Sequence, residues 1–320
     1  MDDSLILVRA VHFVSTLLVS GVVLFLIFVA EPAFRKSGGD THLPTIVRRR
    51  LAYSAWIGLT FVLISGAAWL LIATARMNDI PFAEVFSNAA VWTVLTQTDF
   101  GYDWVTRLFL AILLAAALLP VHSTRGIASK WKGLIAVSFA AGLVATLAWA
   151  GHAAAGTGFA RTFHLIADGL HLIAAAAWIG ALVPLAGLLA AAEHRVEESS
   201  ITIAREAVLR FSTLGIVSVV TLMTTGIINT LMLVGSVTVL IGTDYGRLLL
   251  AKVVLFLVML AIASVNRLLL TPHIIRAQSS EPLRQLRINS LIEATIGALI
   301  LIIVSVLGTL PPGIQEQTAG

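Results

Sequence analysis

Residues 161–185 read R-T-F-H-L-I-A-D-G-L-H-L-I-A-A-A-A-W-I-G-A-L-V-P-L, which from Thr162 onward is apolar for long enough to cross a lipid bilayer. The stretch nevertheless carries His164, Asp168 and His171. Because these residues stand at positions i, i+4 and i+7, they lie within about 60° of one another on a helix. Ionisable groups in a membrane span are costly, and they usually face a cavity, a partner or a metal ion. The stretch therefore predicts a transmembrane helix with a polar stripe.

Two imidazoles and a carboxylate on one stripe are suited to form half of a transition-metal site. The alternative is that His164 and Asp168 are solvated at the membrane interface and that His171 bonds to a neighbouring helix. For any one of these residues the alternative is the better interpretation. For three of them on one stripe we favour a functional role.

The composition places the whole chain in the membrane. The 320 residues are 58% hydrophobic and only 12% charged, with a mean hydropathy of +0.96. These values are typical of a polytopic, all-α membrane protein. The chain contains no cysteine, which excludes disulfides, thiolate metal ligands and a thiol nucleophile.

Apolar segments of spanning length divide the chain into helices and short connections. We predict eight transmembrane helices, at roughly 5–30, 51–75, 102–121, 133–151, 163–190, 208–234, 246–270 and 288–309. The connection 77–101 is the longest on its side of the membrane. Within it, Pro81 and the apolar spacing predict a short amphipathic helix at about 81–95 that lies at the membrane interface.

The basic residues alternate between the two sides of the predicted bundle. Fifteen of the 21 fall in or beside the connections 31–50, 122–132, 191–210 and 271–287. This pattern indicates topology rather than nucleic-acid binding, despite a pI near 9.8. The positive-inside rule then predicts that both termini lie on the outer side of the membrane.

Two pairs of matching motifs indicate an internal repeat. Thr98-Asp99-Phe100-Gly101 opens the third span, and Thr243-Asp244-Tyr245-Gly246 opens the seventh. Likewise, nine residues separate His12 from Gly21 in the first span and His171 from Gly180 in the fifth. We therefore predict two parallel four-helix repeats, 1–158 and 159–320, related by an axis along the membrane normal.

The histidines of the outer side are the candidate metal ligands. His12, His152, His164 and His171 come from the first, fourth and fifth spans. Neutral imidazole binds copper, zinc, iron and nickel, and Asp168 can act as a ligand or fix an imidazole tautomer. We expect a metal to enter past His152 and His164 and to reach a position between His12 and His171. The alternative is that His12 and His171 each bond a carbonyl or hydroxyl within its own repeat.

Four other polar residues lie inside predicted spans, where they would line a pathway or support the metal ligands. They are Arg107, Asn229, Lys252 and Glu293. Interhelical hydrogen bonds are the alternative role for Asn229, and Glu293 could instead extend to the cytoplasmic interface. Arg107 and Lys252 are candidates to pair with an aspartate or an anionic ligand. No nucleotide motif, phosphate-binding loop or Ser-His-Asp arrangement is present, so the sequence does not predict an enzyme.

At three of its motifs the chain resembles the copper resistance D family of bacterial inner-membrane proteins. They are H-L-I-A-A-A-A-W-I-G-A-L-V-P-L at 171–185, D-Y-G-R-L-L-L-A-K at 244–252 and L-G-T-L-P-P at 307–312. The resemblance covers all eight spans. It implies a protein that moves copper from the periplasm toward the cytoplasm, working with a small periplasmic copper-binding partner.

The wider family is also similar to four-span proteins that bind haem through a histidine of the first span and a cation of the third. Here the resemblance maps that pattern onto His12 with Arg107 and onto His171 with Lys252. Two hypotheses follow. The first is a copper transporter with an outer-leaflet His/Asp site, and the second is a redox or sensing protein that binds haem b through His12 and His171.

Overall fold

The structure is a computed structural model that describes residues 3–37, 42–86, 89–119, 127–151, 157–193, 195, 197–276 and 281–313. Within this part of the chain it is all-helical and contains eight helices or helix runs that are long and apolar enough to span a membrane. This confirms the predicted fold class. We call residues 3–151 the first half of the chain and residues 157–313 the second half.

Four runs form the spans of the first half. The first run comprises α1 (Asp3–Phe25), the π-helical segment η1 (Leu26–Ala30) and α2 (Glu31–Ser37). The second span is α3 (Leu43–Met77) and the third is α5 (Asp99–Leu118). The fourth run joins α6 (Ile127–Ala145) to the 3₁₀ segment η3 (Thr146–Ala150).

The second half repeats this sequence of long helices. Its first run comprises α7 (Gly158–Ala175), the π-helical segment η5 (Ala176–Gly180) and α8 (Ala181–Glu193). It is followed by α9 (Glu198–Leu233). The next run comprises α11 (Asp244–Val265), the π-helical segment η6 (Asn266–Leu270) and α12 (Thr271–Arg276), and α13 (Glu281–Leu307) completes the bundle.

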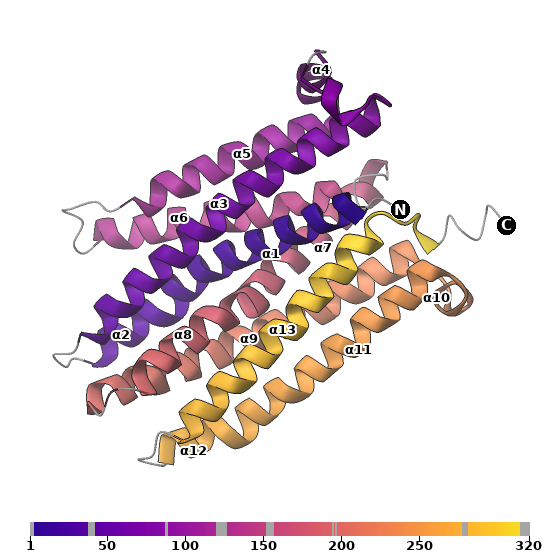
Figure 1. Ribbon diagram of the computed structural model, residues 1–320. Coiled ribbons are helices and arrows are strands. Elements are labelled where there is room, and N and C mark those ends of the chain that lie inside the picture. The colour runs from indigo at the N-terminus through magenta and orange to yellow at the C-terminus, as the bar shows by residue number, and fades with distance from the viewer. Residues whose placement is uncertain are drawn as a thin grey trace.

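Several helices are longer than the predicted spans because they continue beyond the hydrocarbon layer. At 1.5 Å per residue, α3 and α9 are each about 50 Å long, whereas the hydrocarbon core is about 30 Å thick. Their extra turns carry basic residues of the connections, such as Arg48 on α3 and Arg205 on α9. The start of α1, the end of α13, α4 and α10 lie at one end of the bundle, and α2 and α12 lie at the other (Figure 1).

The first and fifth spans form the centre of the bundle. In their most apolar stretches 72% and 78% of the residues are buried, against 44% or less in the other six spans. The two spans meet at Gly21 of α1 and Gly180 of η5, where a Cβ on either residue would overlap the other helix's backbone. Both residues of this crossing come from the predicted repeat motif.

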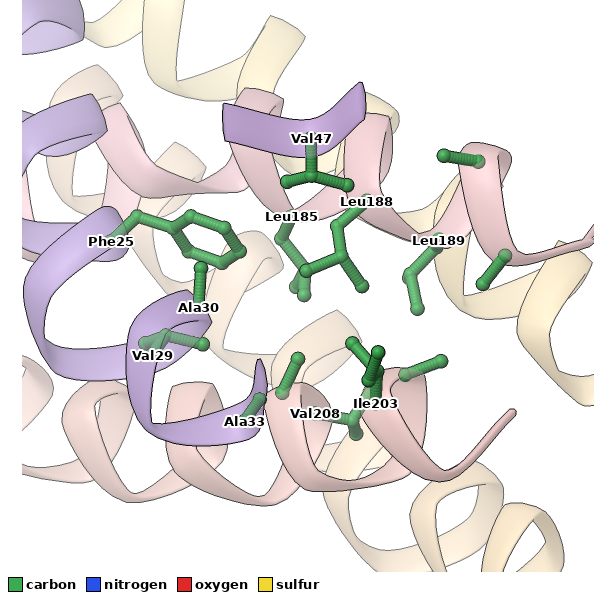
Figure 2. Close-up of a cluster of buried hydrophobic side chains, with 14 of the residues drawn as sticks. Phe25, Val29, Ala30, Ala33, Val47, Leu185, Leu188, Leu189, Ile203 and Val208 are labelled. Atoms are coloured by element: carbon green, nitrogen blue, oxygen red, sulfur yellow. The ribbon is translucent and has the colours of Figure 1, made fainter. Parts of the chain in front are cut away.

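A large apolar cluster joins the halves near the end of the bundle where α2 lies. Figure 2 shows Phe25, Val29, Ala30 and Ala33 of the first span facing side chains of α3, α8 and α9. The labelled residues of these three helices are Val47, Leu185, Leu188, Leu189, Ile203 and Val208. Most are less than 5% exposed. The halves therefore share this buried cluster.

The third and seventh spans begin at similar corners. The Thr98 hydroxyl accepts a hydrogen bond from the Gly101 amide at 3.0 Å, and the Thr243 hydroxyl accepts one from the Gly246 amide at 3.0 Å. Each is an N-cap of the kind that satisfies a free amide at a helix start. A short helix precedes each cap, namely α4 (Ala90–Gln97) and α10 (Val237–Gly242). These recurring corners support the predicted duplication.

The connection 77–101 differs in detail from the prediction. Instead of one amphipathic helix at about 81–95, it forms a short 3₁₀ turn, η2 (Phe82–Glu84), and then α4, which ends at Gln97. Pro81 precedes the 3₁₀ turn rather than a longer helix. The helix α10 was not predicted, although Ser236, which caps it by accepting from the Val239 amide, is a typical N-cap residue.

Candidate metal-binding residues

The imidazole of His171 is fixed in one tautomer by α9. Its Nδ1 atom lies 2.9 Å from the Thr225 hydroxyl, and that hydroxyl donates its own hydrogen to the Thr221 carbonyl at 2.6 Å. Because the Thr225 hydrogen is already used, Nδ1 of His171 must be the donor in their contact. The proton then resides on Nδ1, and the lone pair of Nε2 is available to a metal ion.

His12 has the same arrangement in the first half. Its Nδ1 atom lies 3.0 Å from the Ser65 hydroxyl, which donates to the Phe61 carbonyl at 2.5 Å. His12 is only 1% exposed, and its buried Nε2 atom has no hydrogen-bond partner within the part of the chain that the structure describes. A buried, unpaired nitrogen lone pair is costly, and a metal ion would satisfy it.

A glycine follows the hydroxyl residue in both halves and lies beneath the imidazole. A Cβ atom on Gly66 would be 3.3 Å from Cε1 of His12, and one on Gly226 would be 3.6 Å from Cε1 of His171. The dipeptides Ser65-Gly66 and Thr225-Gly226 therefore orient and accommodate equivalent imidazoles.

Asp168 lies at the meeting point of α7, α9 and α11. Its Oδ1 atom accepts a hydrogen bond from the Asn229 amide at 2.9 Å. Its charge interacts with Lys252 and with Tyr245, both on α11. A Cβ atom on Gly151, at the end of the fourth span, would lie 3.9 Å from Oδ2 of Asp168. We call Asp168, His171, Thr225, Asn229 and Lys252 the Asp168 cluster.

The corresponding region of the first half is built around an aromatic ring. The guanidinium carbons of Arg9 and Arg107 lie 5.1 and 5.3 Å from the centre of the Trp69 ring, within the range of cation–π contacts. The imidazole of His12 packs edge-on against the same ring, with 5.5 Å between ring centres. We call Arg9, His12, Ser65, Trp69 and Arg107 the Trp69 cluster.

The guanidinium group of Arg107 makes its polar contacts within the first half. Arg107 is 3% exposed, and it pairs with Asp103 at 2.5 Å and with the Thr146 hydroxyl at 3.1 Å. Arg9 has no carboxylate partner among the described residues. Two guanidiniums and one carboxylate therefore leave an excess positive charge beside His12.

The two clusters use matching positions with different chemistry. Arg9 and Asp168 each precede their histidine by three residues, and Trp69 and Asn229 each follow their hydroxyl residue by four. In the first half the cation contacts the indole, and in the second half the carboxylate accepts from the amide. Three residues before the histidine, the first half thus has the cation Arg9 and the second half has the anion Asp168. This difference makes the second-half cluster the better environment for a metal cation.

The structure places the predicted stripe on α7 but does not gather its members into a compact chelate. His164 is 6% exposed and lies one turn from Asp168. Among the described residues, no group of three or more His, Asp or Glu side chains is close enough to hold one metal ion. The predicted ligand His152 lies outside the described residues. Metal binding by His12, His164, Asp168 and His171 stays a prediction.

The alternative for His12 and His171 was that each bonds a carbonyl or hydroxyl within its own repeat. The Nδ1 atoms agree with it, since each imidazole bonds a hydroxyl of its own half. A metal shared between their Nε2 atoms remains a prediction, as does haem ligation by the two histidines. Asn229 forms the interhelical hydrogen bond that was its alternative role, and Arg107 pairs with an aspartate.

Glu293 does not extend to the interface. It is 2% exposed and accepts a hydrogen bond from the Asn266 amide at 2.7 Å.

Sequence reasoning missed the residues that orient the predicted ligands. Ser65, Thr225 and Trp69 lie inside apolar spans, where a single hydroxyl or indole usually has only a packing role. One signal was available: Ser65-Gly66 and Thr225-Gly226 place a hydroxyl and a glycine at similar points of the second and sixth spans.

Comparisons with known proteins match the chain over nearly its whole length. Residues 1–162 match the model of the "Copper resistance protein D-like, N-terminal domain", and residues 205–307 match that of "Copper resistance protein D". The stripe on α7 lies between these two ranges. No solved structure matches the chain.

Three curated relatives are similar to the chain. Copper resistance protein D of Pseudomonas syringae pv. tomato is 33% identical, with 100% of both chains covered. Inner membrane protein YebZ of Escherichia coli is 29% identical over 96% of this chain and 98% of its own. Copper transport protein CutJ of Bacillus subtilis is 29% identical over 95% of this chain and 52% of its own.

Proposed function

The chain belongs to the copper resistance protein D family, and we propose that it carries copper ions across the bacterial inner membrane, using the Asp168 cluster and His164 as its outer binding face. Relatives named for copper resistance, copper transport and the inner membrane support this role and location. The eight membrane-spanning helices supply the transmembrane framework.

The contact between His171 and Thr225 carries the proposal for the site. It leaves the Nε2 lone pair of a membrane-embedded imidazole free for a metal. One turn away, Asp168 supplies negative charge that favours a cation, and Asn229 holds its carboxylate in place. Hydrogen-bonded partners of this kind orient metal ligands and raise their affinity.

The direction of transport in this proposal is from the periplasm to the cytoplasm. The basic connections favour periplasmic termini, and the bundle end where α4 and α10 lie would then face the periplasm. His164, Asp168 and His171 occupy the half of their span nearest that end. Copper would arrive there from a small periplasmic copper-binding protein.

The test compares copper accumulation in cells with copper binding by purified protein. Cells that produce the chain should accumulate more copper than cells without it. The double variant His164→Ala/His171→Ala should lose both accumulation and binding while keeping its thermal stability. Asp168→Asn should weaken binding by about 10–100-fold, the usual effect of removing a partner of a metal ligand.

His273→Ala provides a matched control because His273 is exposed and bonds only within its own helical run. This variant should bind and accumulate copper normally. Unchanged copper binding in the double variant would overturn the site. Equal copper content in cells with and without the protein would overturn the transport role.

A further inference from the structure

Glu293 is a buried carboxylate that belongs to neither cluster described above. It lies on α13, is 2% exposed and accepts a hydrogen bond from the Asn266 amide at 2.7 Å. Trp178 lines the same cavity as Glu293, and its indole is close enough to interact with the carboxyl group. Asn266 is held in turn by the Asn289 amide, which donates to its Oδ1 atom at 2.6 Å. Glu293 therefore sits at one end of an ordered polar chain inside the membrane.

The donor Asn266 and the neighbouring Trp178 both come from π-helical segments. Trp178 belongs to η5 and Asn266 belongs to η6. Such wider turns are rare in helices and are often found at functional sites. Here two of them meet at one carboxylate.

Glu293 also lines a cavity of about 210 Å³ between α9, α11 and α13. A water molecule occupies roughly 30 Å³ in the liquid, so the space is large enough for several. The polar side chains that line it are Ser212, Ser264, Asn266, Arg267, Thr271 and Ser290. They provide partners for water beside the carboxylate.

No described neighbour neutralises the charge of Glu293. Arg267 is the other charged residue among those that line the cavity, and its guanidinium donates to the Ser212 hydroxyl at 2.5 Å. The ionic groups of the adjoining helices are paired with one another, Arg210 with Glu206 at 2.7 Å and Arg287 with Glu193 at 3.4 Å. His273 on α12 is exposed and bonds the Leu269 carbonyl.

The ion that suits this site is a proton. The described residues provide no group of three ligands that could hold a metal, whereas a single carboxyl beside water can bind and release one proton. Membrane carboxyl groups without a counter-ion commonly serve as proton relays. The fourth span of the first half, Lys130–Ala150, contains no acidic residue, so this feature is specific to the half that carries the Asp168 cluster.

We propose that Glu293 is a proton-binding site that couples proton movement to the passage of copper through the second half. As a copper cation occupies the second half, the O–H bond of the Glu293 carboxyl breaks and its proton passes to a water molecule in the cavity. After the copper leaves, the carboxylate takes one proton back from water. This inference rests on the proposed copper transport and adds the ion exchanged with it.

The experiment uses the full-length protein in lipid vesicles that contain a pH-sensitive dye and a copper indicator. Adding copper outside should change both signals in vesicles with the unaltered protein. Glu293→Gln, which keeps the size of the side chain but cannot release a proton, should reduce the pH change at least tenfold. Because linked binding equilibria are reciprocal, its copper affinity should be lower than that of the unaltered protein and should lose the pH dependence that proton release at Glu293 gives. Glu293→Asp should retain part of the pH change.

Thr295→Ala is the matched control, because Thr295 lies two residues from Glu293 on α13, is exposed outside the cavity lining and donates to the Leu291 carbonyl. It should leave both signals unchanged. A full pH change in Glu293→Gln, or copper entry without any pH change in the unaltered protein, would overturn the role of Glu293 and leave copper transport standing.

Infrared difference spectra provide a readout that does not depend on transport. Copper binding should alter the carbonyl band of a protonated carboxyl group, and Glu293→Gln should remove that change. If the unaltered protein binds copper and the band does not respond, the inference is wrong. A protein that admits no copper contradicts the proposed function instead, a result that the copper indicator identifies directly.

Discussion

Gly21 of α1 and Gly180 of η5 touch across the centre of the molecule, so that neither position has room for a Cβ atom. In a membrane the hydrophobic effect does not drive helices together, and close packing of small residues takes its place. The contact joins the central spans of the two halves, and it lies nine residues from His12 on one side and from His171 on the other. The same contact thus sets the packing of both histidine-bearing helices.

We predict that Gly180→Ala strongly destabilises the protein. The added methyl group would meet the Leu17 carbonyl and the backbone of Gly21, and backbone cannot move aside as a flexible side chain can. Overpacking of this kind usually costs about 1–3 kcal/mol. Thermal unfolding of the purified protein in detergent should show a clearly lower midpoint for this variant.

Gly187→Ala is the appropriate comparison, since Gly187 lies on the same span and a Cβ there would have nothing within 4 Å. Its midpoint should be equal to or above that of the unaltered protein, because alanine favours a helix. Equal midpoints for Gly180→Ala and Gly187→Ala would show that the two central helices do not pack in this way.

The sequence was sufficient to predict the helices, because the apolar runs have the length needed to cross the bilayer and the basic connections indicate the side of the membrane. It did not predict that the first and fifth spans cross at Gly21 and Gly180, although both glycines belong to the matching motifs of these spans. It failed at α10, which is too short to give a periodic signal. Contacts between distant spans, such as His171 with Thr225, depend on helix rotation and packing, and no single span encodes them.

A second prediction concerns the hydroxyl that fixes His171. In Thr225→Val the shape of the side chain is kept but Nδ1 of His171 loses its hydrogen-bond acceptor. The imidazole can then rotate or change tautomer, so copper affinity should fall by about 10–100-fold. Thr225→Ser should restore most of it. The measurement is a copper titration against a competing chelator of known affinity.

Thr221→Val serves as the control for this titration. Thr221 lies one turn earlier on α9, and its hydroxyl donates only to the Val217 carbonyl of the same helix. Its copper affinity should match that of the unaltered protein. If Thr225→Val also binds copper normally, the orientation of His171 by Thr225 has no part in binding.

A third prediction tests topology and uses the natural absence of cysteine. Glu84 and Arg49 are both exposed and lie in connections on opposite sides of the bundle. In intact spheroplasts, Glu84→Cys should react with a membrane-impermeant thiol reagent. Arg49→Cys should react only after the membrane is permeabilised. The reverse pattern would place the basic connections outside and would contradict periplasmic termini.

The final prediction concerns the unequal charge of the two halves. Arg9 and Arg107, with Asp103 as their one carboxylate among the described residues, leave a net positive charge beside His12, whereas Asp168 offsets the charge of Lys252 beside His171. A unit charge about 8 Å from a monovalent cation changes its energy by roughly 2 kcal/mol at an effective dielectric constant of about 20. Copper should therefore favour the second half, and His171→Ala should reduce copper affinity at least tenfold more than His12→Ala.

This comparison also separates one shared metal from two independent sites. A single copper ion held by both imidazoles would make the two alanine variants equally defective. If the first-half histidine instead binds a separate ion weakly, replacing Arg9 with glutamine should strengthen that binding by about tenfold, because it removes one of the two guanidinium charges near His12 and keeps a polar side chain. Copper stoichiometry, measured by elemental analysis of His171→Ala with and without Arg9→Gln, gives the answer. A higher copper content in the double variant supports charge repulsion as the reason for the asymmetry, and an unchanged content means that Arg9 does not control metal access to His12.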